Sequence, residues 1–175
     1  QSDSPIQTSE FNHILQVKLD RPKANAIDLK TSRILGEIFT KFRDDPNLRV
    51  AIITGEGEKF FCPGWDLNAA AEGDAVDGNY GVGGFGGLQE LRGLNKPVIA
   101  AVAGPAVAGG MELAIWCDIR VMEETAFMGV YCRRWGIPLI DGGTVRLPRL
   151  IGEGRAMDLI LTGRRVDANE ALNIG

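Results

Sequence analysis

The second half of the sequence holds three side chains suited to acid–base chemistry: Glu112, Cys132 and Asp141. Glu112 follows a glycine pair in "AVAGGMEL" (106–113), and the other two lie in "FMGVYCRRWGIPLIDGG" (127–143). Burial raises the pKa of a carboxyl in the first turn of a helix and the helix N-terminus lowers it, so such a group can serve as a general base. Each residue also has a structural interpretation: an exposed or capping glutamate, a small buried cysteine, and an aspartate in a turn.

The sequence lacks the residues that several other chemistries need. It has no GxSxG motif, and its single histidine, His13, lies in a predicted strand, which argues against a Ser–His or Cys–His hydrolase. Its cysteines, Cys62, Cys117 and Cys132, are irregularly spaced and form no CxxC pair. This spacing argues against a structural zinc site or a disulfide framework, so we expect no metal.

Composition and charge favour a small-molecule partner. With 175 residues and 45% hydrophobic content, the chain is long enough for one compact domain. The net charge of −4 comes with no basic stripe, which argues against a nucleic-acid surface. The N-terminal "QSDSPIQTSE" has no apolar signal core, and no apolar run is long enough to span a bilayer. We therefore expect a protein of the cytoplasm, without membrane contact.

Strand and helix patterns alternate along the chain. Apolar residues at helical spacing follow Asp28, which is a suitable N-cap, and short β-branched runs bounded by glycine indicate buried strands. The predicted strands are 13–20, 49–56, 96–104 and 119–123, and the predicted helices are 29–45 and 109–118. Strand–helix–strand units in series indicate a parallel sheet, so the fold class is α/β.

A glycine-rich stretch, "GDAVDGNYGVGGFGG" (73–87), lies between two of these units. No strand leads from it directly into a helix, so we interpret it as a mobile loop rather than a phosphate cradle. Variable loops commonly decide specificity, and we expect this one to decide which ligand is bound.

Two glycine-containing turns follow predicted strands, where α/β sheets bind their ligands. They are "FFCPGWDL" (60–67) and "AVAGGMEL" (106–113). Glycine lets backbone N–H groups face a ligand, and two such groups converging would form an oxyanion hole. The same glycines are equally consistent with ordinary turns and close packing.

Several motifs in order resemble those of the crotonase superfamily, the enoyl-CoA hydratases and isomerases. The resemblance runs from about residue 13 to the end, and up to about residue 100 it is greatest to the carnitinyl-CoA dehydratase branch. It rests on "RPKANAID", "VAIITGEGEKFFCPGWDLNAA", "KPVIAAVAGPAVAGGMELA", "CDIRV" and "GGTVRLPRLIG". It implies a crotonase-like ββα spiral in a single domain, 13–175, preceded by a polar segment, 1–12.

The resemblance implies a site for an acyl-CoA thioester. The backbone N–H groups of Trp65 and Gly109 match the oxyanion hole that stabilises the thioester enolate. Coenzyme A is then part of the substrate, and no separate cofactor is expected. The residues expected to line the substrate are Lys23, Ala24, Asn25, Gly64, Asp66, Leu67, Gly110 and Cys132.

The resemblance also assigns the acid–base residues. Glu112 matches one of the two glutamates of the hydratases, whereas Cys132 occupies the place of the second. A thiol is a weaker acid than a carboxyl, so hydration in the usual two-glutamate manner is in doubt. Asp141 matches the position from which dienoyl-CoA isomerases present an aspartate. Two hypotheses remain open: a lyase or isomerase, and a CoA-thioester-binding protein without hydratase activity.

Relatives continue beyond the segment "VDANEALNIG" into C-terminal helices, whereas this sequence ends at Gly175. The resemblance implies that those helices cover the acyl pocket and contact neighbouring subunits. Apolar surface left open by their absence would favour association. We therefore expect a homo-oligomer, a trimer or hexamer by family resemblance.

Overall fold

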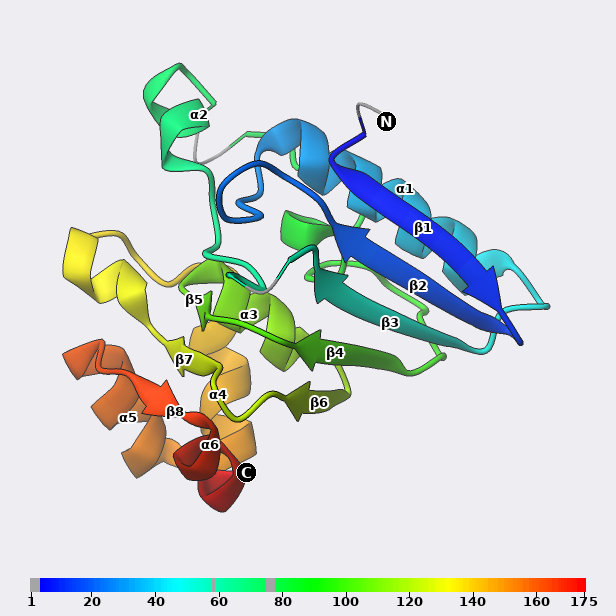
Figure 1. Ribbon diagram of the computed structural model, residues 1–175. Coiled ribbons are helices and arrows are strands. Elements are labelled where there is room, and N and C mark those ends of the chain that lie inside the picture. The colour runs from blue at the N-terminus through cyan, green and yellow to red at the C-terminus, as the bar shows by residue number, and fades with distance from the viewer. Residues whose placement is uncertain (1–3, 58, 75–77) are drawn as a thin grey trace.

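The computed structural model describes residues 4–57, 59–74 and 78–175. Among these residues, a five-stranded sheet has the order β1-β2-β3-β4-β6 (Figure 1). β2, β3, β4 and β6 are parallel, and β1 is antiparallel to β2. The strands are β1 (Ile6–Phe11), β2 (Ile14–Leu19), β3 (Val50–Gly55), β4 (Val98–Val102) and β6 (Ile119–Met122). The predicted α/β class with a parallel sheet is confirmed.

The polar segment at residues 1–12 contributes a strand to the sheet. β1 (Ile6–Phe11) pairs with β2 along its whole length, from Ile6 opposite Leu19 to Phe11 opposite Ile14. Only Ile6 of this strand is buried, and the other five residues are exposed. A strand with so little apolar burial is hard to distinguish from a polar tail by pattern alone, so this strand was not predicted.

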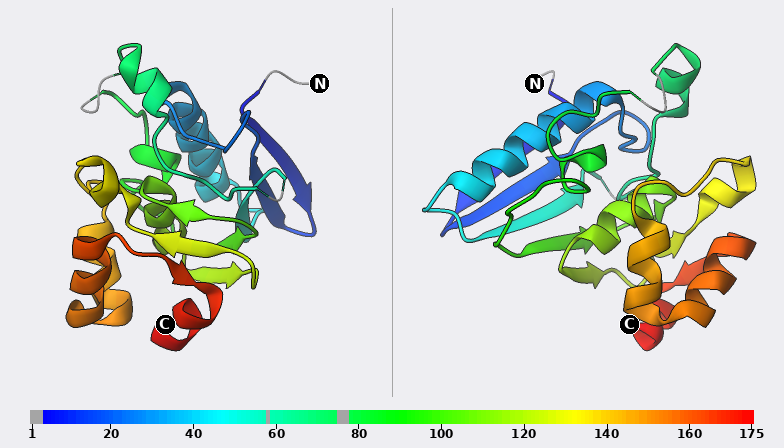
Figure 2. Two further views of the ribbon diagram at one scale, coloured as in Figure 1. Left: turned by 60° about the vertical axis from the view of Figure 1, so that its left-hand side comes forward. Right: turned by 180° about the vertical axis from the view of Figure 1, so that it is seen from behind.

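Helix α1 (Leu29–Asp44) covers one face of the sheet, as seen from behind in Figure 2. Asp28 is its N-cap, as predicted, and accepts a hydrogen bond from Thr31 N at 2.7 Å. Leu35, Phe39 and Phe42 recur at helical spacing and are fully buried. This apolar stripe holds the helix against the sheet and forms the centre of the core.

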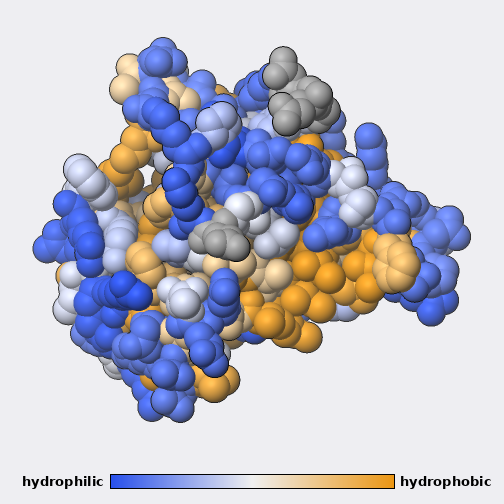
Figure 3. Space-filling view, in the orientation of Figure 1, coloured by the Kyte–Doolittle hydropathy of each residue, from blue (hydrophilic) through white to orange (hydrophobic). Residues whose placement is uncertain are grey.

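The opposite face of the sheet carries apolar side chains without a helix over them. Figure 3 shows this apolar area over the strands. Ile119 and Val121 of β6 are 53% and 62% exposed. The area exists because the two residues alternate outward on a strand whose neighbours are also apolar.

The glycine-rich stretch is packed at its C-terminal end, where residues 83–87 are buried, whereas Gly73, Asn79 and Val82 are exposed. The 3-10 helix η1 (Phe85–Gly87) is buried and lies against α1. Ser32 of α1 donates its hydroxyl to Gly84 O and accepts from Gly86 N, each at 3.0 Å. Residues 75–77 of the predicted loop lie outside the described residues.

The second half of the chain surrounds the buried helix α3 (Gly109–Trp116). A small sheet, in the order β5-β7-β8, lies beside it (Figure 1). The remaining elements are β5 (Ala106–Val107), β7 (Phe127–Gly129), β8 (Val166–Asp167), α2 (Leu67–Ala71), η2 (Tyr131–Trp135), α4 (Gly143–Ile151), α5 (Glu153–Thr162) and α6 (Ala168–Ile174). None of the helices in the described ranges has the length and apolarity that a bilayer crossing requires.

Candidate active site

Two glycine turns predicted to approach each other are in contact. Gly64 has φ +94°, and a Cβ atom added there would lie 2.6 Å from the backbone nitrogen of Gly109. A Cβ atom added at Gly110 would overlap the carbonyl oxygen of Cys62. Only glycine permits both the left-handed conformation and the close approach. The turn at residue 64 is therefore packed directly against the N-terminus of α3.

The amide groups at this contact have a defined arrangement. Ile27 N donates to Gly64 O and Asp66 N donates to Ile27 O, each at 2.9 Å. The Trp65 N–H lies between these two bonds and, within the described chain, has no acceptor. The Gly109 N–H likewise has no acceptor there, because the first N–H groups of a helix have no partner inside the helix. The structure thus leaves two amide donors open where the turn meets α3.

Glu112 lies in the first turn of α3, three residues after Gly109, and its side chain is only 1% exposed. Its Oε2 accepts a hydrogen bond from Gly143 N at 2.6 Å, and its Oε1 has no partner among the described residues. Burial raises its pKa to about 8, opposed by the Gly143 hydrogen bond and assisted by the charge of Asp141. The interpretation as an exposed glutamate is excluded.

Asp141 lies in the segment that leads into α4, close enough for its charge to act on Glu112. Burial raises its pKa to about 6. Its carbonyl oxygen accepts a hydrogen bond from Trp116 Nε1 at 2.7 Å. Two carboxyl groups with different pKa values therefore share one region of the protein.

Cys132 of η2 is buried beside the same two carboxyl groups. Burial is the main reason that its pKa rises to about 11, and the charges of Glu112 and Asp141 add to the effect. The thiol is therefore protonated at neutral pH. Its neighbours Arg133 and Arg134 are exposed and donate to the carbonyls at the end of α5, which agrees with their interpretation as surface groups.

Residues 9–175 match the sequence model of the family described as enoyl-CoA hydratase/isomerase. The chain belongs to this family. It is 54% identical over 162 residues to carnitinyl-CoA dehydratase of Proteus mirabilis and 56% identical over 162 residues to that of Citrobacter koseri. These matches cover 93% of the chain, so the similarity extends beyond its N-terminal half. The chain spans only 62% of the length of either relative.

Solved structures agree with the family assignment. The chain superposes on an enoyl-CoA hydratase of Mycobacterium tuberculosis with a TM-score of 0.90 and 37% identity, covering 99% of this chain and 67% of the other. It superposes on DspI of Pseudomonas aeruginosa with a TM-score of 0.87 and 33% identity, covering 100% and 73% of the two chains. The crotonase-like fold that the sequence motifs implied is thus confirmed.

The segment that the family resemblance predicts to contact coenzyme A forms a tight turn. Lys23 is exposed and Asn25 is buried, and both have positive φ, 72° and 60°. The Asn25 amide donates to Glu56 O and Phe60 O and accepts from Arg21 N. Its side chain therefore holds the turn, and Ala24 lies between these two residues with its side chain partly exposed.

Asp66 and Leu67 begin α2 next to the open amide of Trp65. Asp66 is the N-cap of α2, and its Oδ1 accepts from Asn68 N and Ala69 N. Leu67 is 49% exposed, so it is available for contact with a ligand.

Two aromatic rings near the open amides, those of Tyr80 and Phe85, were not predicted from the sequence, whereas Trp65 was expected near the site. Trp65 packs edge-on against Tyr80, with 6.1 Å between ring centroids, and Tyr80 packs edge-on against Phe85 at 5.9 Å. The Phe85 ring contacts Gly109, because a Cβ atom added at Gly109 would lie 3.0 Å from it. Tyr80 and Phe85 belong to the glycine-rich stretch. Two aromatic residues in an otherwise polar loop were the sequence feature that could have predicted their packing at this site.

A surface cavity lies elsewhere in the described chain. It has a volume of about 530 Å³ and lies beside Trp116, Gly142 and Arg146. The guanidinium of Arg146 stacks on the Trp116 ring at 3.4 Å. Neither the Gly64–Gly109 contact nor the carboxyl of Glu112 lines this cavity, so it is separate from the site described above.

Proposed function

We propose that the protein is an acyl-CoA thioester lyase or isomerase of the enoyl-CoA hydratase or carnitinyl-CoA dehydratase type. The observation that carries this proposal is the pair of open N–H groups of Trp65 and Gly109, the second of which lies in the same helical turn as the buried carboxyl of Glu112. Gly64 supports it, because its lack of a side chain permits the contact between the two turns.

In this proposal the two N–H groups form the oxyanion hole. They donate to the thioester oxygen, which gains negative charge as the enolate forms. Donors already fixed by the backbone need no reorganisation during the reaction. Loss of one such donor raises the activation free energy by about 3 to 4 kcal/mol, which lowers kcat. The aromatic rings of Trp65 and Phe85 exclude water from this position, which strengthens the interaction.

Glu112 and Asp141 form an acid–base pair across the acyl group. At pH 7 a carboxyl with a pKa of about 8 is mostly protonated, and one with a pKa of about 6 is mostly ionised. In the dehydration direction Asp141 takes the α-proton, and the C–H electrons pass into the enolate. Glu112 then gives its proton to the β-hydroxyl, the C–O bond breaks, and water leaves as the double bond forms. Return of the proton from Asp141 to Glu112 restores the enzyme.

The relatives' names indicate the substrate class. Coenzyme A would lie along Lys23, Ala24, Asn25, Asp66 and Leu67 as part of the substrate, without a separate cofactor. Similarity to carnitinyl-CoA dehydratases over 93% of the chain favours carnitinyl-CoA as the acyl thioester to test first. The exposed apolar area on the sheet supports assembly into a homo-oligomer, and a cytoplasmic location fits an acyl-CoA enzyme.

A second candidate function is binding of a CoA thioester without hydratase activity. The observation that favours it is Cys132, whose protonated thiol replaces the second carboxyl and cannot activate water as a base. Both candidates use the same oxyanion turn, so binding alone does not separate them, whereas turnover does.

The test is the ultraviolet absorbance of the conjugated thioester. Purified protein is mixed with carnitinyl-CoA or with 3-hydroxybutyryl-CoA, and a gain in absorbance reports dehydration. Crotonyl-CoA is used for the hydration direction. The expected result is turnover that Glu112→Gln abolishes. The substrate that reacts faster indicates whether the activity is of the enoyl-CoA hydratase or the carnitinyl-CoA dehydratase type. Thioester binding without turnover in either direction would support the second candidate instead.

A further inference from the structure

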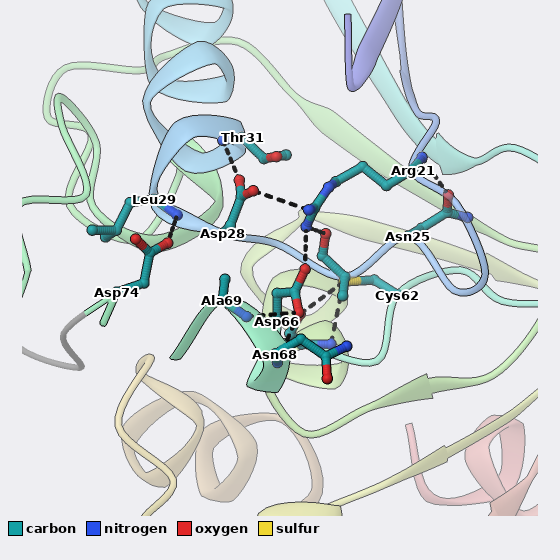
Figure 4. Close-up of polar contacts among 12 residues, drawn as sticks. Arg21, Asn25, Asp28, Leu29, Thr31, Cys62, Asp66, Asn68, Ala69 and Asp74 are labelled. Atoms are coloured by element: carbon teal, nitrogen blue, oxygen red, sulfur yellow. Dashed lines mark hydrogen bonds and ion pairs between the residues drawn. The ribbon is translucent and has the colours of Figure 1, made fainter. Parts of the chain in front are cut away.

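Arg21 joins two helices through their N-cap residues (Figure 4). Its guanidinium forms ion pairs with Asp28 and with Asp66, each at 2.9 Å, and also donates to Ala26 O at 2.5 Å. Asp28 caps α1, and Asp66 caps α2. All three charged side chains are 20% exposed or less, so the pairs are partly shielded from solvent.

Each aspartate uses its other carboxylate oxygen for its own helix. Asp28 Oδ1 accepts from Thr31 N at 2.7 Å, and Asp66 Oδ1 accepts from Asn68 N at 3.0 Å. Oδ2 of each aspartate faces Arg21. Burial favours a higher pKa for Asp28, but the hydrogen bonds from Thr31 and the charge of Arg21 outweigh it and lower the pKa. Both aspartates are therefore anchored on one side by a helix and on the other by Arg21.

The same two segments are joined by a backbone bridge around Trp65. Ile27 N donates to Gly64 O, and Asp66 N donates to Ile27 O. The open Trp65 N–H lies between these two bonds. The only charged link that the described residues form across this bridge is Arg21, which pairs with the residues on either side of it, Asp28 and Asp66.

We propose that Arg21 is a positioning residue that holds the Trp65 N–H in the direction needed to stabilise an enolate. The inference rests on the proposed oxyanion role of Trp65. Without the guanidinium, two carboxylates would face each other across the 27–65 bridge with no cation between them, and the turn would move away from α3. Arg21 touches neither the substrate nor the reacting atoms.

The contacts of Arg21 argue against a direct role in binding coenzyme A. A guanidinium that binds phosphate needs free donors and net positive charge. Here two carboxylates and one carbonyl already accept from it. Lys23, which is exposed in the same turn, is the cation available for a phosphate.

The kinetic test compares Arg21→Met and Arg21→Lys with Arg43→Met. Arg43 also pairs with an aspartate, Asp44, but at the exposed end of α1. We expect Arg21→Met to lower kcat by about 10- to 100-fold with KM within about 3-fold, because a misplacement of about 1 Å costs up to about 100-fold. The kcat of Arg21→Lys should lie between those of Arg21→Met and the unsubstituted protein, because a lysine cannot reach both carboxylates in the fork geometry of a guanidinium. Arg43→Met should match the unsubstituted protein.

Chemical rescue distinguishes loss of the positioning guanidinium from a general loss of folded structure in Arg21→Met. Added guanidinium ion should restore part of kcat to Arg21→Met and none to Glu112→Gln. A kcat within about 2-fold of the unsubstituted protein, or a loss seen only in KM, would overturn the inference. So would a loss in Arg21→Met that guanidinium does not restore at any concentration below denaturation.

Amide hydrogen exchange tests the inference independently of turnover. The Ile27 and Asp66 amides report on the bridge, and the Ala51 amide, bonded to Pro97 O, reports on the sheet. We expect Arg21→Met to speed exchange of the first two by about 10-fold or more without changing the third. Unchanged exchange of the Ile27 and Asp66 amides in Arg21→Met would overturn the inference, whatever the activity of the variant. If Arg21→Met speeds this exchange but the unsubstituted protein shows no turnover, Arg21 still positions the turn, and the proposed function is rejected instead.

Discussion

The backbone N–H of Gly143 donates a 2.6 Å hydrogen bond to Oε2 of Glu112, a carboxyl that is otherwise enclosed by the core. Oε1 of the same carboxyl has no partner among the described residues. Protonation at Oε1 fits this arrangement, because Oε2 must remain an acceptor for Gly143. Glu112 is thus bonded to the start of α4 on one side and has a proton to donate on the other.

The buried carboxyl of Glu112 should make stability depend on pH. Its pKa is about 8 in the folded protein and near 4.5 when unfolded, so its contribution is fully present below pH 4.5 and is lost as pH rises through 8. Over that window the loss is on the order of 4 kcal/mol. Glu112→Gln should remove this slope. Urea unfolding of both proteins at about pH 4, 7 and 9, which bracket the window, checks it. Equal slopes would show that Glu112 is ionised in the folded state.

Activity should depend on pH in a bell shape. The productive form has Asp141 ionised and Glu112 protonated, so kcat/KM should fall below pH of about 6 and above about 8. Asp141→Asn should remove the acidic limb together with most of the turnover. A profile of kcat/KM against pH measures both limbs, and full turnover in Asp141→Asn would exclude Asp141 from the mechanism.

Gly64 should not tolerate a side chain. Gly64→Ala adds a Cβ atom 2.6 Å from Gly109 N, at a residue with φ +94°. Gly57→Ala is the matched control, because Gly57 has φ +76° but no atom within 4 Å of the added Cβ. Both substitutions carry backbone strain of about 1 kcal/mol, and only Gly64→Ala separates the two open amides. We expect kcat to fall by about 100-fold or more in Gly64→Ala and to stay near the unsubstituted value in Gly57→Ala.

A glutamate in place of Cys132 should increase hydration activity. Cys132→Glu places a third carboxyl beside Glu112 and Asp141, whose charges already act on this position. We expect faster hydration of crotonyl-CoA, by about 10-fold or more, as a carboxyl at this position becomes available to activate water. Cys132→Ser controls for loss of the thiol and should change the rate by less than about 3-fold. A large loss in Cys132→Ser would instead give the thiol a role of its own.

Trp116 should support the position of Asp141. Its Nε1 donates to Asp141 O at 2.7 Å, and its ring lies against Gly142, where an added Cβ atom would be 2.7 Å from it. Trp116→Phe keeps a ring but removes the donor, at a cost of about 1 kcal/mol to stability. We expect kcat/KM to fall by about 10-fold. Trp135→Phe, at a ring 72% exposed, is the control. Equal kinetics for the two variants would contradict the proposed support.

Local patterns predicted most of the elements that position the site. The apolar spacing after Asp28 identified α1 and its cap, and β-branched runs identified β2, β3, β4 and β6. β1 was missed because only Ile6 of its six residues is buried. The burial of the end of the glycine-rich stretch was not predicted because it depends on Ser32, a residue of a distant helix that no local pattern connects to it.

The motifs of the sequence alone determined the family, and they supplied the residues of the proposed site: the glycines of both turns, Glu112 and Asp141. Only the tertiary structure decided how these groups differ in charge. The pKa of a carboxyl depends on how far packing removes it from water and on which amides reach it, and Gly143, 31 residues from Glu112, is brought to it only by the fold. The same reason applies to Arg21: its charge is visible in the sequence, but its two aspartate partners are set by the approach of α1 and α2.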